Sequence, residues 1–130
     1  MSGNFLLLSG YNARGQAYAQ AMIKAGITPD RVVLYGDSDR DIPRPEAARP
    51  SEFYDELYLP DLTVTLRQSC ETQCWNVMAL AAESVNDREI AAAIEDASPG
   101  LIVYAGYGGQ LVGRDVLDLG YPIMHCHSGW

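Results

Sequence analysis

Short apolar runs alternate with longer mixed stretches along most of this chain. Five such runs predict strands, at residues 5–8, 31–35, 75–80, 101–104 and 121–127. Strands that are buried on both faces read as continuous apolar runs rather than as alternating ones. The pattern therefore favours a parallel sheet covered by helices on both sides.

The stretches between these runs predict the helices, at residues 13–24, 63–73, from 86 onward, and 115–119. Gly26 is a good C-terminal stop for the first helix. Asn86 and Glu89 have the spacing of a capping box at the start of the third. We therefore predict an α/β fold, doubly wound and Rossmann-like, with a mostly parallel sheet and helices on both faces.

Two segments depart from this alternation. Residues 37–60 hold four of the seven prolines and many charges, which predicts a long surface excursion with a short extended piece at 53–59. Residues 128–130 follow the last predicted strand directly, at the kind of strand end where sites are usually built. With 130 residues, we expect one domain over residues 1–130, incomplete at its C-terminus.

Charge and composition narrow the function classes. The chain carries 9 basic and 17 acidic residues, for a net charge of −8, and no basic stripe. Nucleic-acid binding usually relies on Lys and Arg, so a small-molecule substrate fits better. No apolar run approaches the roughly 20 residues of a membrane helix, and no signal peptide is evident. We expect a cytoplasmic protein without a membrane partner.

The two histidines of the chain, His125 and His127, fall at the end of the last predicted strand. Side chains alternate along a strand, so both would lie on one face. Such histidines can act as general acid or base, or donate a hydrogen bond to an oxyanion. That interpretation and a merely polar strand end carry about equal weight. Zinc needs three or four protein ligands, so no metal site is expected here.

The cysteines give no site. Cys70 and Cys74 share one helical face, but a single pair with this spacing is neither a zinc nor a redox motif. We expect both to face the core. With Cys126 the count is three, which argues against a disulfide framework.

The first predicted strand leads into a glycine-bearing turn. Gly10 and Gly15 match the outer glycines of a dinucleotide fingerprint, but Asn12 stands at the middle one. Asp37, at the end of the second strand, would suit a ribose hydroxyl. Because of the mismatch, an ordinary tight turn is the favoured interpretation, and binding of NAD or another nucleotide is the alternative.

A second glycine-rich turn, Tyr107, Gly108, Gly109 and Gln110, follows the fourth strand. Glycines let a ligand approach the backbone closely, and flat heterocycles are often bound through such backbone groups. Composition alone does not distinguish this from a turn that only links strand to helix.

Residues 101–119 and 122–130 together resemble the N-terminal domain of 10-formyltetrahydrofolate-dependent formyltransferases, a family acting on methionyl-tRNA, glycinamide ribonucleotide and sugar nucleotides. The resemblance implies that His127 is the catalytic histidine and that His125 stands where most members have a catalytic asparagine. It places Tyr107, Gly108 and Gly109 near the folate's pterin pocket, with Gln110 in the same turn. We assign Tyr11 and Asn12 to the substrate.

The implied activity is transfer of a formyl group from 10-formyltetrahydrofolate to an amine, and the acidic charge favours a small acceptor such as an amino sugar. Ser128 replaces the family's usual proline, and its catalytic aspartate and Leu-Pro-x-x-Arg-Gly segment fall beyond Trp130. We therefore expect little catalysis by these 130 residues alone. A non-catalytic folate-binding pseudoenzyme is a further alternative. Apolar edges left exposed would favour a homo-oligomer.

Overall fold

A computed structural model describes residues 2–44 and 60–126, and within this part of the chain five strands form one sheet. The strands are β1 (Ser2–Gly10), β2 (Thr28–Tyr35), β3 (Val77–Ala79), β4 (Leu101–Ala105) and β5 (Ile123–Met124). All neighbouring pairs are parallel, in the order β3-β2-β1-β4-β5. The predicted α/β Rossmann-like class is confirmed. The order reverses at β1, which makes its boundary with β4 the topological switch point where such sheets bind ligands.

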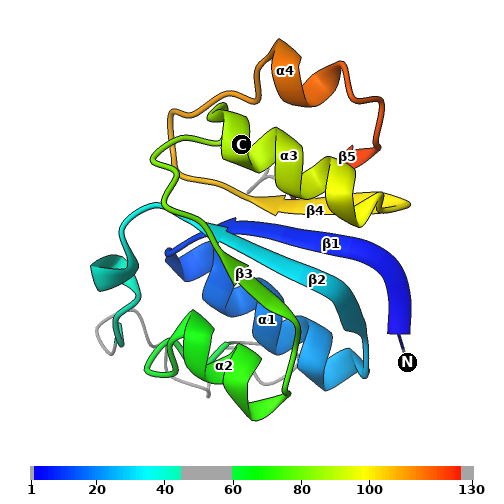
Figure 1. The fold of residues 1–130 in the computed structure, drawn as a ribbon. Helices are drawn as coiled ribbons and strands as arrows, with labels where there is room; N and C mark the ends of the chain where they lie inside the picture. Colours follow the sequence, from blue (N-terminus) through cyan, green and yellow to red (C-terminus); the bar gives the residue numbers. More distant parts are fainter. Residues whose placement is uncertain (1, 45–59, 127–130) are drawn as a thin grey trace.

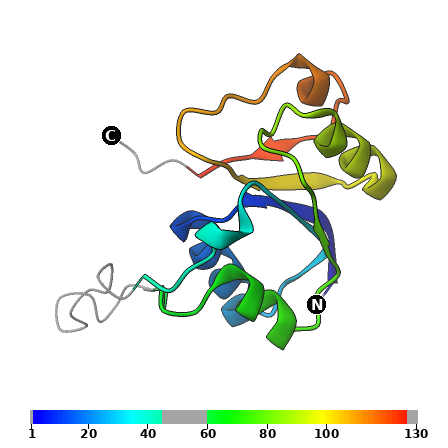
Figure 2. The same cartoon turned by 60° about the vertical axis from the view of Figure 1, so that its left-hand side comes forward.

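Helices cover both faces of the sheet. They are α1 (Ala13–Ala25), α2 (Leu66–Thr72), α3 (Arg88–Ala97) and α4 (Arg114–Leu117), with a 3-10 turn η1 (Ser38–Arg40) after β2. Figure 1 shows α1 and α2 below the sheet and α3 and α4 above it. Figure 2, turned by 60°, shows the same three layers.

The apolar runs supply both cores because alternate residues of one strand face opposite sides. Leu7 and Val103 pack with Ala19 of α1 on one face. Leu6 and Ile102 pack with α3 on the other. The continuous apolar runs of the sequence are thus explained by a sheet that is buried on both faces.

Helix α1 agrees closely with its prediction. Gly26 adopts a left-handed conformation, with φ of 71°, and its amide donates to the carbonyl of Ile23 at 3.1 Å. The capping box predicted at Asn86 and Glu89 is wrong. The helix begins after Asp87, and the Asn86 side chain instead accepts from Gly113 N and donates to Leu111 O.

Helix α2 begins three residues later than predicted. The Thr65 hydroxyl accepts from Gln68 N and the Gln68 side-chain oxygen accepts from Thr65 N, which makes a capping box. Because the helix ends at Thr72, only one of the two cysteines faces the core. Cys70 is buried, but Cys74 is exposed and has a φ of 55°, so the expectation that both are buried is wrong.

The last strand is shorter than the predicted 121–127, since β5 ends at Met124. The extended piece predicted at 53–59 lies outside the described residues. Across residues 2–44 and 60–126, no helix has the length and apolar character required to span a membrane.

Candidate functional site

The candidate site lies along the edge of the sheet where the strands end. Asn12 connects two of these ends. Its Oδ1 accepts from Gly15 N at 2.7 Å and so caps α1, and its Nδ2 donates to the carbonyls of Ala105 and Gly106 at 3.2 Å each. This amide therefore holds the β1–α1 turn against the exit of β4. The asparagine at the middle of the incomplete glycine fingerprint is explained by this role.

His125 lies just beyond β5 and is exposed. Arg14, in the first turn of α1, places its Nη1 2.7 Å from His125 Nε2. The imidazole also lies against Tyr104 of β4, with ring centroids 5.7 Å apart. Residues that are 111 positions apart in the sequence thus meet at the open end of the sheet.

Strand β5 ends at Met124, so His125 lies beyond the strand from which the shared face of the two histidines was predicted. His127 lies outside the described residues, so the structure places only His125. No group of three or more His, Cys, Asp or Glu side chains able to hold a metal ion occurs in the described part of the chain.

Tyr107 turns its side chain inward, between the ends of β1 and β2. Its hydroxyl accepts from Tyr11 N at 2.8 Å and donates to the carbonyl of Tyr35 at 3.1 Å. The rings of Tyr35 and Tyr107 meet edge to face, with centroids 5.4 Å apart. The hydroxyl therefore uses the turn amide that an anion at this helix N-terminus would need.

Two glycines make room for this ring. A Cβ at Gly10 would lie 2.6 Å from the Tyr107 ring, and one at Gly36 would lie 2.2 Å from its hydroxyl. Gly36 also has a φ of 92°, a conformation that other residues rarely adopt. The glycine at the end of β1 is thus needed for packing against a tyrosine.

A polar cavity of about 570 Å³ lies beside this tyrosine, a size typical of small-molecule sites. Its lining comes from the ends of β2 and β4 and from the segment after β3: Gly36, Asp37, Arg40, Glu83, Tyr107, Gly108 and Gln110. The Arg40 guanidinium lies 5.7 Å from the centroid of the Tyr107 ring. Gly108 and Gly109 are exposed, and a Cβ on either would meet no atom within 4 Å.

Gln110 is engaged inside the protein. Its Oε1 accepts from Tyr35 Oη and from Val85 N, at 3.3 Å each, and its Nε2 donates to Glu83 O. Tyr35 is buried, and its hydroxyl also lies 3.3 Å from that of Tyr104. Burial, followed by the hydrogen bond to Tyr104, raises the pKa of Tyr35, so the Tyr35 hydroxyl stays neutral at physiological pH.

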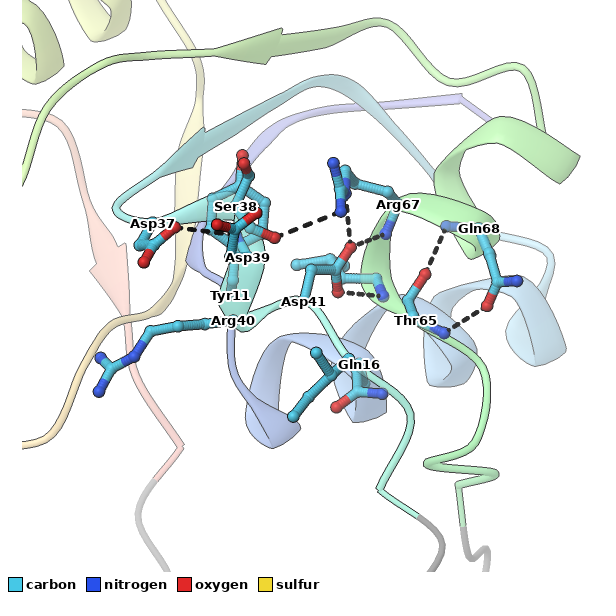
Figure 3. A network of polar contacts seen from close by, with 12 residues as sticks. Tyr11, Gln16, Asp37, Ser38, Asp39, Arg40, Asp41, Thr65, Arg67 and Gln68 are labelled. Carbon is cyan, nitrogen blue, oxygen red and sulfur yellow. Dashed lines mark hydrogen bonds and ion pairs between the residues drawn. The ribbon is translucent and has the colours of Figure 1, made fainter.

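The Tyr11 side chain is buried and lies beside Arg67, whose guanidinium is 5.9 Å from the ring centroid. Arg67 in turn binds Asp41, whose carboxylate is fully buried. Asp41 accepts from the amides of Leu66 and Arg67 at 2.8 and 3.0 Å and from Arg67 Nε at 2.9 Å. Figure 3 shows this network between η1 and α2. Only the backbone of Tyr11 therefore faces the strand ends.

Asp37 is the one dinucleotide feature that stays at the surface. Its carboxylate accepts from Asp39 N at 2.9 Å and begins η1, while the residue itself is exposed and lines the cavity. In the described part of the chain, no buried side-chain nitrogen or oxygen lacks a hydrogen-bond partner. The exposed side chains of Asp37, Arg40 and Glu83 on the cavity wall stand outside this set.

Sequence reasoning missed Arg14, Arg40, Asp41 and Glu83. Arg14 carried a usable signal, since it lies in the first turn of a helix that starts at the same sheet edge as His125. The partners of Asp41 are 25 and 26 residues away, across the excursion, and no local pattern reveals them.

No protein-family model matches this chain, and no curated protein matches it either. Among solved structures, it is similar to the spore coat polysaccharide biosynthesis protein spsE from Bacillus subtilis, with 19% sequence identity and a TM-score of 0.30. The similarity covers 93% of this chain and 35% of that one, so this chain spans about a third of that protein's length. A likeness this weak carries no argument about function.

Proposed function

We propose that this protein transfers the formyl group of 10-formyltetrahydrofolate to an amine of a small acceptor, such as an amino sugar. The observation that carries the proposal is the contact between Arg14 and His125 just beyond β5. Asn12, two residues before Arg14, holds the β1–α1 turn to the end of β4 by its hydrogen bond to Ala105 O. Polar side chains gathered at the carboxyl ends of parallel strands are typical of active sites. The formyltransferase resemblance implies a catalytic pair at His125 and His127, and His125 is a member of the Arg14 contact.

In the proposed reaction, the acceptor nitrogen attacks the formyl carbon and the carbonyl electrons move to oxygen. His125 donates its imidazole N–H to the resulting oxyanion. The intermediate collapses when the bond between the formyl carbon and N10 breaks. His127 takes the proton that the amine loses and returns it to N10 of the leaving tetrahydrofolate. Atoms and charge balance without a metal or redox partner.

The cavity beside the second glycine-rich turn is the proposed place for the pterin ring. Gly108 is exposed there, and its missing side chain leaves the backbone open to a flat ligand. At the rim of the cavity, Arg40 offers hydrogen-bond donors and the carboxylate of Glu83 offers acceptors. Tyr107 and Gln110 would act mainly by shaping the wall, since both are bonded to the protein itself.

The test is calorimetric titration of the chain with 5-formyltetrahydrofolate, a stable analogue. We expect micromolar binding that weakens at least tenfold in Gly108→Leu, which places a bulky side chain on exposed backbone that lines the cavity, and also weakens in His125→Ala. Gln73→Ala, an exposed change at the far end of α2, should bind as the wild type does. A folded chain that does not bind the analogue would contradict the proposal.

Nucleotide binding is the second candidate, favoured by the exposed Asp37 on the cavity wall. It is weakened by Tyr107, whose hydroxyl holds the Tyr11 amide. A pyrophosphate at that amide would require the tyrosine to move. Titration with NAD under the same conditions distinguishes the two candidates. Binding of NAD that is lost in Asp37→Ala, by a chain that does not bind 5-formyltetrahydrofolate, would favour the nucleotide.

Self-association stays a prediction. An apolar groove of about 360 Å³ lies between α1 and the β4–β5 edge, with Met22, Val103 and Met124 among its lining residues. Burying such a groove in a second copy would be favourable. A monomer at all concentrations in sedimentation equilibrium would contradict the homo-oligomer.

A further inference from the structure

Helix α1 reaches across the sheet edge to hold the segment that follows β5. Arg14 and Tyr18 are four residues apart, so they lie on one face of the helix. Arg14 Nη1 is 2.7 Å from His125 Nε2, and the Tyr18 hydroxyl donates to the carbonyl of Cys126 at 3.4 Å. Two successive residues of the β5 exit are therefore contacted by two successive turns of α1.

Because Arg14 can only donate hydrogen bonds, its contact determines which nitrogen of His125 carries the proton. A guanidinium carries only N–H donors and keeps its charge at every pH at which proteins fold. The short contact to Nε2 therefore requires that this nitrogen be the acceptor, with no proton on it. The neutral imidazole then carries its single proton on Nδ1.

We infer that Arg14 is a positioning residue that holds His125 as the neutral imidazole with its proton on Nδ1, while Tyr18 holds the backbone beside it. Protonation of Nε2 would break the contact and bring two cations together, so the arginine disfavours the imidazolium form. Other titratable groups also lie near the ring. Tyr104 of β4 lies against the ring, and Cys126 and Tyr18 contact each other beyond it.

This inference deepens the proposed function and takes its catalytic meaning from it. A neutral imidazole with one defined N–H is the form that can donate to an oxyanion over the whole neutral range. A histidine that was left to ionise freely would change its donors between pH 5 and 8. The arginine would thereby give the histidine the pH-independent donor that an asparagine amide supplies at the corresponding family position.

The test is long-range ¹H–¹⁵N spectroscopy of the imidazoles in the full 130-residue chain, with His127→Gln used to assign the two rings. At pH 8 we expect His125 to show a protonated Nδ1 and an unprotonated Nε2. In Arg14→Ala the two tautomers should become mixed, and the imidazole should titrate at a higher pH than in the wild type. Lys24→Ala, which removes a positive charge at the other end of α1, should leave both signals unchanged.

Tyr18→Phe provides a second variant, because it removes the contact to Cys126 without changing charge. We expect it to broaden the His125 signals while the Nδ1 tautomer remains the major one. A wild-type His125 protonated on Nε2, or a tautomer and titration identical in wild type and Arg14→Ala, would overturn the inference. Folate titration is a separate measurement. Failure of that titration with the expected spectra would reject the proposed function and leave the positioning role standing.

Discussion

The two halves of the strand-end edge use their polar groups in opposite ways. Over β1 and β2, the closed end, Tyr107 fills the space between Gly10 and Gly36 and satisfies two backbone groups. Over β4 and β5, the open end, Arg14 and His125 meet at the surface. The Tyr11 amide that a phosphate would need is thus bonded to Tyr107, whereas the contact between Arg14 and His125 is exposed.

This difference indicates which strand ends of a Rossmann-like sheet can carry a functional site. A Rossmann-like sheet does not by itself predict a dinucleotide, since one inward tyrosine can take the place of the phosphate. Polar groups at the closed end contribute to stability, so their removal should be measured in unfolding. Changes at the open end should leave stability nearly intact and alter chemistry.

The largest effect is expected for Tyr107→Ala. It removes a half-buried ring and leaves the Tyr11 amide and the Tyr35 carbonyl without their partner, which should lower the free energy of unfolding by about 3 kcal/mol. Chemical denaturation measures this loss. Tyr107→Phe, which keeps the ring, is the matched control and should lose about 1 kcal/mol.

A substitution at Gly36 tests whether this glycine makes room for the Tyr107 ring. Gly36→Ala should destabilise the wild type by about 2 kcal/mol, because its Cβ would lie 2.2 Å from the Tyr107 hydroxyl and its φ is 92°. In the Tyr107→Ala background the clash is absent, so the second loss should be smaller. Strict additivity of the two changes would show that the glycine does not serve the tyrosine.

The next effect concerns Asp41, which joins η1 to α2 beside the closed end. Asp41→Ala leaves the amides of Leu66 and Arg67 without an acceptor and should destabilise the protein by about 2 kcal/mol. Asp41→Asn keeps one acceptor oxygen and should lose roughly half as much. Equal losses for the two variants in a denaturant titration would mean that the charge, rather than the hydrogen bonds, stabilises α2.

The sequence predicted the fold well because each strand carries its own signal. The runs at residues 5–8 and 101–104 fall inside β1 and β4, and Gly26 ends α1 as expected. The capping box at Asn86 failed because a local pattern cannot show that the Asn86 amide is already bonded to the loop before α4. Local sequence patterns predict which segments form helices and strands, whereas contacts between distant segments determine where a helix such as α3 begins.

The candidate site was predictable only in part. Its location at the strand ends follows from the fold class, and His125 is found there. The inward direction of Tyr107 depends on the close approach of Gly10 and Gly36, which come from different strands. A turn rich in glycine suggests an open ligand loop, yet its tyrosine and glutamine are bonded inside the protein.

The alkylation rates of Cys70 and Cys126 give a chemical comparison of a buried and an exposed part of the molecule. Cys70, on the buried face of α2, has its pKa raised to about 12, first by burial and then by Asp41 and Glu71. A raised pKa leaves much less thiolate, so iodoacetamide at pH 8 should modify Cys70 far more slowly than an ordinary exposed thiol. Exposed Cys126, beside His125, should react quickly. Peptide mass spectrometry measures both rates.

The same raised pKa gives a pH dependence with a definite sign. Between pH 9 and 12 the Cys70 thiol ionises in the unfolded chain but not in the folded one, so the unfolded state binds fewer protons. Stability from this group is complete below pH 9 and is lost as the pH rises toward 12. Cys70→Ala should flatten that part of the curve. An unchanged slope would indicate that Cys70 already reaches solvent in the folded protein.

The smallest effect on stability should come from the open end. Arg14→Ala removes an exposed contact, and exposed pairs of this kind usually contribute less than about 0.5 kcal/mol. The unfolding curve should therefore overlay that of the wild type, although the imidazole of His125 changes its tautomer. A loss comparable to that of Tyr107→Ala would break the comparison, because the arginine would then hold the fold together. With an unchanged curve and an altered imidazole, the open end would be the part of the sheet edge whose polar groups serve chemistry.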